Sequence, residues 1–390
     1  MAYRRDRLTW TAFGALFAFG YVNAVLGPSL PYIRSAEGIS YVAGAAHQVA
    51  FAAGGGIAGL LSTRGRLPVG RRTAIAWGIG GAGLAALVVG YGETAAITIT
   101  AALAMGLLAT LALIRVWAAL ADAHGPRRAV AMSEGEVAVS LAGIVTPLVI
   151  GALAGTAVSW RFAFVIGAVT AVCAVLLVLQ ADFPQPSRRG QARPRHSGVR
   201  PTLVIVLAIV ALEFALSFWL ASYLNQSVRI ARDTAVALVS VLYAANLGGR
   251  FVASRLARTQ SAERVLLAAL GLVSVGLPFV LAATNVMSAV VGIVLAAAGI
   301  GTLFPLTSSL HVHVSGGTAD SALGEILSVA AIGQMGGPLL AGAIAQAVTL
   351  RVGLLVILPT LTIVAAVGLA AHRHRVKVTT PSGRMSPHET

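Results

Sequence analysis

Twelve apolar stretches, each about as long as a membrane-spanning helix, occupy most of this 390-residue chain. A helix needs roughly 20 mostly apolar residues to cross the hydrocarbon core of a bilayer. The stretches fall at 9–29, 40–62, 73–91, 95–117, 129–154, 161–181, 202–224, 234–255, 265–284, 287–310, 322–347 and 352–371. They predict an all-α membrane protein with twelve transmembrane helices, in which the short connections 92–94 and 285–286 form tight helical hairpins.

The composition excludes an ordinary soluble domain. Only 11% of the residues are charged and 57% are hydrophobic, whereas a soluble domain carries about 25% charged residues. The net charge of +15 does not indicate a nucleic-acid partner, because the basic residues form short clusters between apolar runs. The start MAYRRDR resembles a secretory signal, but its apolar run is long and eleven more follow, so we expect a retained first span.

The basic residues also predict the orientation. With the N-terminus inside, 21 arginines and lysines fall on the cytoplasmic side and five on the outside. Cytoplasmic loops carry the excess of basic residues in membrane proteins. We therefore expect a multi-pass protein of the plasma membrane with both termini in the cytoplasm.

A polar segment divides the chain into two sets of six spans. Residues 182–201 are rich in proline and arginine and show no apolar periodicity, which is typical of a linker. Its charges either bind anionic lipid headgroups or only direct the topology. The predicted organisation is an N-terminal six-helix half at 1–181, this cytoplasmic linker, a C-terminal half at 202–376 and a disordered tail at 377–390.

The two halves contain a repeat. Matching residues of the fifth and eleventh spans are separated by 191 positions, and the pairs are Glu134–Glu325, Pro147–Pro338 and Gly151–Gly342. In the fourth and tenth spans, Gly106 matches Gly299 at an offset of 193. One unit built twice in the same orientation predicts a pseudo-twofold axis along the membrane normal, with a cavity between the halves.

Several motifs resemble the major facilitator superfamily of secondary transporters, over essentially the whole chain from Trp10 to Ala371. The family's glycine-to-arginine signature between spans two and three is matched at Gly59, Arg64 and 70–72, although Thr63 replaces its aspartate. Span five carries the family's proline motif at Gly143, Pro147 and Gly151, and Trp160-Arg161 precedes span six. The resemblance implies a transporter that works by alternating access.

The resemblance leaves the direction of transport open. The full proline motif of span five is associated with drug-exporting antiporters, but Thr146 replaces its glycine before the proline. The segments GPSLPYI and GISYVAGAAHQVAF resemble fucose-permease-like sugar importers. Those importers carry acidic residues in spans one or four, where this chain has Asn23 and no acid. We therefore lean to efflux of a small organic compound, with proton-coupled sugar import as the alternative.

Glu213 is the strongest candidate for proton coupling. It lies near the middle of the span 202–224. An ionisable residue at the bilayer centre costs roughly 2.5–3.5 kcal/mol on insertion scales and faces a cavity or a partner. Its expected role is to carry the coupled proton or to pair with a cationic substrate. The competing interpretation is a neutral, hydrogen-bonded glutamate that only fixes helix packing.

A second group of charges suggests a cytoplasmic gate. Glu134 and Glu325 lie within the first turns of spans entered from the cytoplasm, and Glu136 has Arg115 as its expected partner. The predicted gate comprises Glu134, Glu136, Glu325, Arg64, Arg115, Arg128, Arg250 and Arg255. Its contacts would form when the cavity opens outward and break when it opens inward. Static caps at two helix starts are the alternative.

Polar side chains of the inner spans outline a substrate cavity. The candidates are Tyr21, Asn23, His47, Gln48, Trp219, Tyr243, Asn246 and Gln334. Tyr243, Asn246 and Arg250 recur at i, i+3 and i+7, which places them on one helix face. Aromatic and amide groups suit a sugar or a flat organic molecule, whereas Trp and Tyr near span ends also serve as interface anchors.

Other classes of function find little support in the sequence. No His, Cys or carboxylate set has metal-site spacing, and no nucleophile, base and acid stand out together. The glycine clusters do not follow a strand, so we discount nucleotide binding. We expect no enzyme activity and no cofactor. The expected partners are a small-molecule substrate, protons and the lipid bilayer, and the expected state is a monomer. A membrane sensor or scaffold would need a large soluble domain or a long signalling tail.

Overall fold

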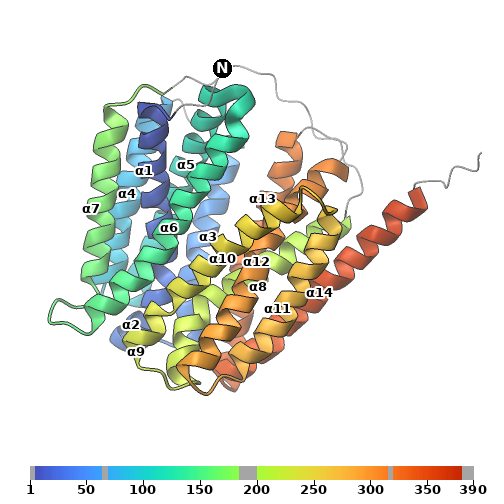
Figure 1. The fold of residues 1–390 in the computed structure, drawn as a ribbon. Helices are drawn as coiled ribbons and strands as arrows, with labels where there is room; N and C mark the ends of the chain where they lie inside the picture. The colour runs from blue at the N-terminus through green and yellow to red at the C-terminus, as the bar shows by residue number, and fades with distance from the viewer. Residues whose placement is uncertain (1–4, 64–68, 184–199, 315–318, 380–390) are drawn as a thin grey trace, which may run out of the picture.

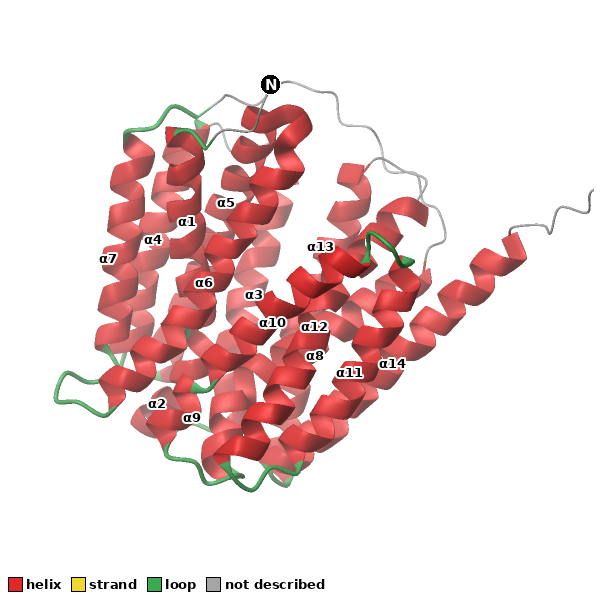
Figure 2. Ribbon diagram, in the orientation of Figure 1, coloured by secondary structure: helices red, strands yellow, loops and turns green. Residues whose placement is uncertain are grey.

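A computed structural model describes residues 5–63, 69–183, 200–314 and 319–379 (Figure 1). This part of the chain contains helices, turns and loops and no strand (Figure 2). The helices are α1 (Arg7–Ala24), α2 (Leu26–Glu37), α3 (Tyr41–Thr63), α4 (Arg71–Tyr91), α5 (Ala95–His124), α6 (Arg128–Ala154), α7 (Phe162–Leu179), α8 (Arg200–Gln226), α9 (Arg232–Ala237), α10 (Val239–Leu256), α11 (Ala262–Leu281), α12 (Val286–Val314), α13 (Ala319–Ala347) and α14 (Leu350–Thr379), with a 3-10 turn at Gly125–Arg127.

These helices make up the twelve predicted spans, which confirms the fold class. The pairs α1–α2 and α9–α10 each form one interrupted span, and every other helix forms one span by itself. By length and hydropathy, eleven spans qualify as membrane-crossing helices among the described residues. The remaining span is α3, which is 23 residues long. The short links after α4 and after α11 lie where the hairpins are expected.

The first span is longer than predicted. Its predicted end at residue 29 is wrong, because α2 continues to Glu37. Pro28 lacks the N–H that would bond to the carbonyl of Ala24, and the helix is interrupted at Val25 rather than ended there. The true end is at Gly38, whose φ of 63° is left-handed and whose N–H donates to the Arg34 carbonyl.

The linker and the tail lie mostly outside the described residues. Residues 184–199 of the predicted linker and residues 380–390 of the predicted tail are not described. The helix α14 continues to Thr379. The first three residues of the predicted disordered tail, 377–379, are therefore helical.

The helices form two groups of six spans (Figure 1). Helices α1–α7 build one half and α8–α14 the other. We call the end of the bundle where α1 begins and α14 ends the terminal side, and the opposite end the distal side. Helices α2 and α9 lie at the distal side, and the halves contact each other through α3 with α13, α2 with α8, and α6 with α9 and α10.

The repeated glycines lie at related contacts between the halves. A Cβ on Gly151 of α6 would come within 2.7 Å of the Asp233 carbonyl in α9. A Cβ on Gly342 of α13 would come within 3.3 Å of the Tyr41 carbonyl in α3. The fifth span of each half thus packs closely on the other half at its distal end, because these positions carry no side chain.

The predicted match of Gly106 with Gly299 is wrong by two positions. Gly106 packs against Phe51, so it joins the fourth span to the second. In the other half, Gly301 packs against Asn246 of the eighth span, whereas Gly299 packs against α11, the ninth span. Gly301 is therefore the structural counterpart of Gly106. Both residues occur in similar glycine-rich segments, so sequence similarity alone could not choose the register.

Gly106→Ala should destabilise the N-terminal half. The added methyl group would overlap the Phe51 carbonyl, and overpacking of this kind costs about 1–3 kcal/mol. The matched control is Gly56→Ala in α3, where a Cβ would meet nothing within 4 Å and the helix gains up to about 1 kcal/mol. Thermal unfolding in detergent measures both; equal melting temperatures for the two variants would contradict the packing role of Gly106.

Candidate functional site

Glu213 lies at the midpoint of the 27-residue helix α8. Its Oε1 accepts a hydrogen bond of 3.2 Å from Nδ2 of Asn246 in α10. The Arg250 guanidinium, one turn further along α10, is close enough to interact electrostatically with this carboxylate. Glu213 is half-buried. A mid-span carboxyl group therefore has an amide and a cation as neighbours, both supplied by one face of the eighth span.

Arg250 connects the halves. Its Nη1 donates to Oε2 of Glu136 in α6 over 3.4 Å, and its Nε donates to the Gly301 carbonyl over 3.2 Å. The sequence predicts Arg115 as the partner of Glu136. In the structure Glu136 instead pairs with Arg250, which belongs to the other half. The Nε of Arg115 is buried without a hydrogen-bond partner in the described part of the chain. Sequence spacing favours a neighbour on the adjacent span, but the pairing is set by how the halves face each other.

These residues form what we call the Glu213 cluster, comprising Glu136, Glu213, Tyr243, Asn246 and Arg250. The predicted i, i+3, i+7 face of α10 supplies three of the five members. The Tyr243 ring lies against Gly143 of α6, where an added Cβ would come within 2.8 Å of it. Asn246 has a buried Oδ1 without a hydrogen-bond partner among the described residues. The cluster spans both halves and contains two carboxylates and one guanidinium.

Three of the predicted cavity residues are buried and form hydrogen bonds within their own halves. The Tyr21 hydroxyl donates to the Ala163 carbonyl over 2.9 Å, and Nε1 of Trp219 donates to the Pro338 carbonyl over 2.9 Å. His47 is 1% exposed, and its Nε2 lies 2.9 Å from the Thr98 hydroxyl. In this conformation their role is packing between helices. A contact of Tyr21, His47 or Trp219 with substrate stays a prediction.

The other predicted cavity residues have unmet hydrogen-bonding groups or partial exposure. Asn23 and Gln334 are half-buried. Gln48 is buried in α3, and its Nε2 has no hydrogen-bond partner among the residues that the structure describes. Together with Oδ1 of Asn246, this amide offers one donor and one acceptor whose hydrogen-bonding capacity is unmet. Buried polar groups are normally satisfied, so both atoms are available for a polar ligand or water.

Of the predicted gate carboxylates, Glu134 and Glu325 pair within their own halves, whereas Glu136 pairs with Arg250 of the other half. Glu134 binds Arg5 through two hydrogen bonds of 2.9 and 2.7 Å. Glu325 accepts from Nε2 of His311 at 3.2 Å, and Nδ1 of this histidine lies 2.7 Å from the Thr202 hydroxyl. Neither partner was predicted. The side chains of Arg64 and Arg128 lie outside the described residues, and Arg255 is exposed on α10.

An ion pair at the terminal side, between a buried arginine and an exposed aspartate, is not predicted from the sequence. Arg71 is 4% exposed, and its Nη2 donates to Oδ2 of Asp122 over 2.9 Å. Asp122 ends the fourth span and thus provides a carboxylate next to the arginine signature, in which Thr63 replaces the family's aspartate. The sequence signal that could have identified this pair is an acidic residue, Asp122, on the same side of the membrane as the arginine signature.

A second missed group closes the distal side. The Tyr41 hydroxyl of α3 donates to Oε1 of Gln226 in α8. The backbone N–H of Tyr41 donates to Oε1 of Gln346 over 3.0 Å. The Arg34 guanidinium lies 3.6 Å from the Tyr41 ring centroid. A stack of Tyr32 on Trp160, with Arg232 5.5 Å from the Tyr32 ring, lies beside the α2–α9 contact. Aromatic rings and arginines therefore join the distal ends of the halves.

The described residues contain no group of three or more His, Cys, Asp or Glu side chains arranged to hold a metal ion. The chemistry available in the Glu213 cluster is thus proton binding, ion pairing and hydrogen bonding.

Comparisons with known proteins identify the family and the fold. The sequence profile of the Major Facilitator Superfamily matches residues 12–324. The chain belongs to the Major Facilitator Superfamily. No curated protein matches the sequence. The family consists of membrane transporters rather than enzymes, so the chain is a multi-pass membrane transporter.

Solved structures share its fold. A bacterial homolog to the human lysosomal transporter Spinster, inward-facing and occupied, gives a TM-score of 0.74 at 16% identity, over 99% of this chain and 100% of that chain. A mutant of the nucleoside transporter NupG gives 0.75 at 11%, over 94% and 99%. A D-xylose–proton symporter gives 0.72 at 16%, over 94% and 95%. At these identities the likeness concerns the fold alone.

Gly151→Val should open the distal side. The added side chain would overlap the Asp233 carbonyl and separate α6 from α9, at a cost of about 1–3 kcal/mol to the closed packing. In a Cys173→Ser background, a cysteine replacing Ala45, which is 0% exposed in α3, reports the opening. We expect membrane-impermeant maleimide to label it roughly 5- to 150-fold faster.

The matched control for this wedge is Gly248→Val, because a Cβ at that position of α10 would meet nothing within 4 Å. It should leave the labelling rate unchanged. An equal rate in the Gly151→Val and Gly248→Val proteins would show that the α6–α9 contact does not hold the distal side closed.

Proposed function

We propose that the protein is a proton-coupled secondary transporter that works by alternating access, with Glu213 as the proton carrier. The observation that carries this proposal is the position of Arg250, which pairs with Glu136 and lies within electrostatic range of Glu213. Glu213 belongs to the same half as Arg250, whereas Glu136 belongs to the other half and accepts a hydrogen bond from it. A proton on Glu213 can therefore change a contact between the halves.

The charges of the cluster favour one bound proton or one bound cation. With both carboxylates ionised, Glu136, Glu213 and Arg250 carry a net charge of −1. Uncompensated charge within a membrane protein is costly, and protonation of Glu213 makes the set neutral. A cationic substrate would neutralise it equally. One site could therefore bind either a proton or a cationic substrate, and the two would compete for it.

The coupling mechanism follows from competition for one guanidinium. When Glu213 is ionised, Arg250 is attracted to its own half as well as to Glu136. When Glu213 binds a proton, the attraction within the half is lost and Glu136 becomes the remaining anionic partner in the cluster. Because Glu136 lies on α6 of the other half, proton binding alters the relative stability of conformations that differ in the α6–α10 contact. The Arg250 side chain is 31% exposed and that of Glu136 51%, so the pair itself contributes only about 0–1 kcal/mol, which suits a contact that must break.

For the substrate, we propose a small polar organic compound that is exported. The unmet amide atoms of Gln48 and Asn246, with Tyr243 and Gln334, would supply hydrogen bonds and an aromatic face. The leaning to export rests on the proline motif of span five. Proton-coupled sugar import is the alternative, and the shared fold with a D-xylose–proton symporter is compatible with it.

We also propose that Glu134 and Glu325 act in a gate at the terminal side. In this conformation each carboxylate is held within its own half, by Arg5 and by His311. Such pairs would hold these two acids within their own halves in this conformation. With the chain in the plasma membrane as a monomer and the terminal side cytoplasmic, this conformation corresponds to an inward-facing state.

Glu213→Gln should abolish transport driven by a pH gradient. The amide keeps the size and hydrogen-bonding capacity of the protonated acid but cannot release a proton, so substrate should only equilibrate. The measurement is accumulation of candidate cationic drugs and sugars by proteoliposomes under an imposed pH gradient. The control is Glu263→Gln. Glu263 lies in α11 and pairs with Arg373, so this variant should transport normally. Full gradient-driven accumulation in Glu213→Gln would reject the proton-carrier role.

Arg250→Gln should move the pH profile of transport to higher pH. Loss of the cation disfavours ionised Glu213, so release of the proton requires a more alkaline solution. A shift of about one pH unit corresponds to roughly 1.4 kcal/mol of lost interaction. Arg255→Gln, on the same helix but exposed, should leave the midpoint unchanged. An unshifted midpoint in Arg250→Gln would contradict the shared-guanidinium mechanism.

A further inference from the structure

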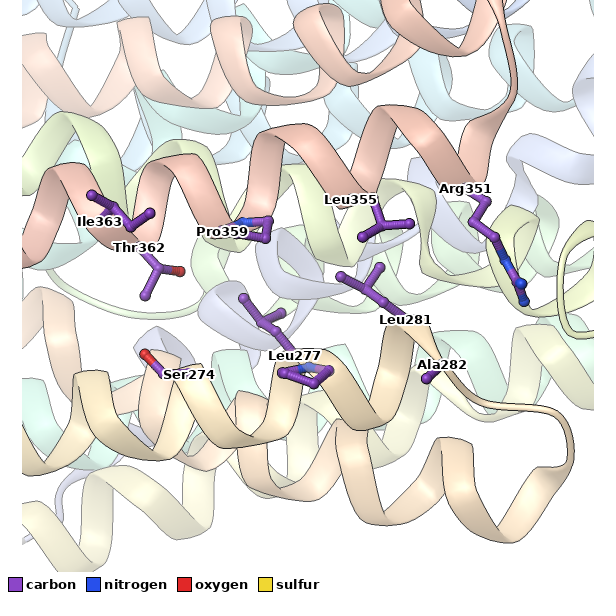
Figure 3. A pocket seen from close by; sticks show the side chains of 10 residues that line it. Ser274, Leu277, Leu281, Ala282, Arg351, Leu355, Pro359, Thr362 and Ile363 are labelled. Atoms are coloured by element: carbon purple, nitrogen blue, oxygen red, sulfur yellow. The ribbon is translucent and has the colours of Figure 1, made fainter.

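A crevice lies between α11 and α14, away from the Glu213 cluster (Figure 3). Its volume is about 530 Å³. Leu281 of α11 points toward Leu355 of α14, and Ser274 of α11 points toward Thr362 of α14 (Figure 3). The outer wall faces the surroundings of the bundle, since Leu355 is 48% exposed and Ile363 62% exposed. In a membrane protein this crevice opens to lipid.

Prolines explain why two adjacent helices leave this space. Both helices contain an internal proline, Pro278 in α11 and Pro359 in α14, and both line the crevice. A proline removes one backbone hydrogen bond and bends the helix. The hydroxyl groups in the crevice are already satisfied, because Ser274 donates to the Leu270 carbonyl and Thr362 to the Leu358 carbonyl. These two hydroxyl groups are therefore occupied, and the interior of the crevice presents mainly apolar groups to a ligand.

The crevice has the length of one lipid leaflet. Along α14 it extends from Arg351 to Ile363, which is roughly 18 Å at the rise of an α-helix. Half the hydrocarbon core of a bilayer is about 15 Å thick. Arg351 lies in the first turn of α14, at the distal end of the span. An acyl chain that entered the crevice there would reach about the middle of the membrane.

Arg351 supplies a positive charge at the mouth of the crevice. Its Nη2 donates to the Ser227 carbonyl over 3.2 Å, and the guanidinium also contacts the Tyr223 hydroxyl. A guanidinium has five N–H donors, so others remain for a ligand. The side chain is partly exposed. The positive end of the α14 dipole lies at the same place. Guanidinium groups bind phosphate through paired, charge-assisted hydrogen bonds.

A second crevice provides a comparison. It lies between α4 and α5, has a volume of about 630 Å³, and is lined by Leu84, Val88, Ile97 and Thr100 among others, with no charged residue. Thr100 is exposed, and its hydroxyl donates to the Ala96 carbonyl, as that of Ser274 does to Leu270. Both crevices are lined mainly by apolar side chains, but only the α11–α14 crevice has prolines in its wall and an arginine at its mouth.

We propose that the α11–α14 crevice is a binding site for an anionic phospholipid of the distal leaflet. One acyl chain fills the apolar space, and the headgroup phosphate binds Arg351. The length of the crevice selects an acyl chain, and the single charge selects an anionic headgroup over a zwitterionic one, in which a quaternary ammonium group offsets the phosphate.

Native mass spectrometry of the full-length protein in detergent tests the site, with phosphatidylglycerol and phosphatidylcholine as probes. We expect phosphatidylglycerol to bind more tightly, and Arg351→Gln to weaken its binding about tenfold or more, as loss of a charged hydrogen bond implies. Ser274→Trp should fill the crevice and also weaken binding. Thr100→Trp, the matched substitution in the other crevice, should leave it unchanged. Soluble glycerol phosphate should not displace the lipid, because it lacks the acyl chain.

Three results would overturn the proposal. They are equal affinity for the two lipids, unchanged phosphatidylglycerol binding in Arg351→Gln, and an equal loss of binding in Thr100→Trp and Ser274→Trp. Displacement by glycerol phosphate would identify a headgroup site without a chain site and would also overturn it. If Ser274→Trp does not fold, as judged by thermal unfolding, the headgroup comparison and Arg351→Gln decide the question.

Discussion

Charge within the membrane-spanning part of this protein must be compensated by a partner, because hydrocarbon cannot solvate it. Glu213, at the midpoint of α8, meets this requirement through Asn246 and Arg250. Arg250 in turn reaches Glu136 of the other half. The arginine that compensates the charge of Glu213 therefore also contacts the other half, at the α6–α10 contact. For this reason protonation of Glu213 can affect the conformation of the protein.

The distal closure depends on a different interaction, the close approach of helices at glycine. Gly151 and Gly342 let the fifth span of each half touch the other half. Tyr41 and the Tyr32–Trp160 stack add hydrogen bonds and cation–π contacts at the same level. The terminal side instead contains ion pairs within each half, such as Arg5–Glu134 in the N-terminal half and Glu263–Arg373 in the C-terminal half. Packing that is dense at one end and ionic at the other permits one end to open while the other stays closed.

Sequence reasoning was most accurate where one physical rule dominates. The twelve spans follow from hydropathy alone, and the face shared by Tyr243, Asn246 and Arg250 follows from helical periodicity. It failed where the outcome depends on distance between spans. Glu136 pairs with Arg250 rather than Arg115, and Gly106 corresponds to Gly301 rather than Gly299. His47 and Trp219 are polar enough to suggest a cavity, yet each satisfies its ring nitrogen within its own half.

The sequence by itself determined that the chain is a twelve-span helical protein built from two related halves, because apolar length and the repeat of glutamate, proline and glycine are local properties. It also identified Glu213 as the unusual charge. Only the tertiary structure decided which residues surround that charge, which end of the bundle is closed, and that Arg351 lies at the mouth of a lipid-length crevice. These features depend on contacts between residues far apart in the chain, and helix periodicity specifies a face without specifying what lies opposite it.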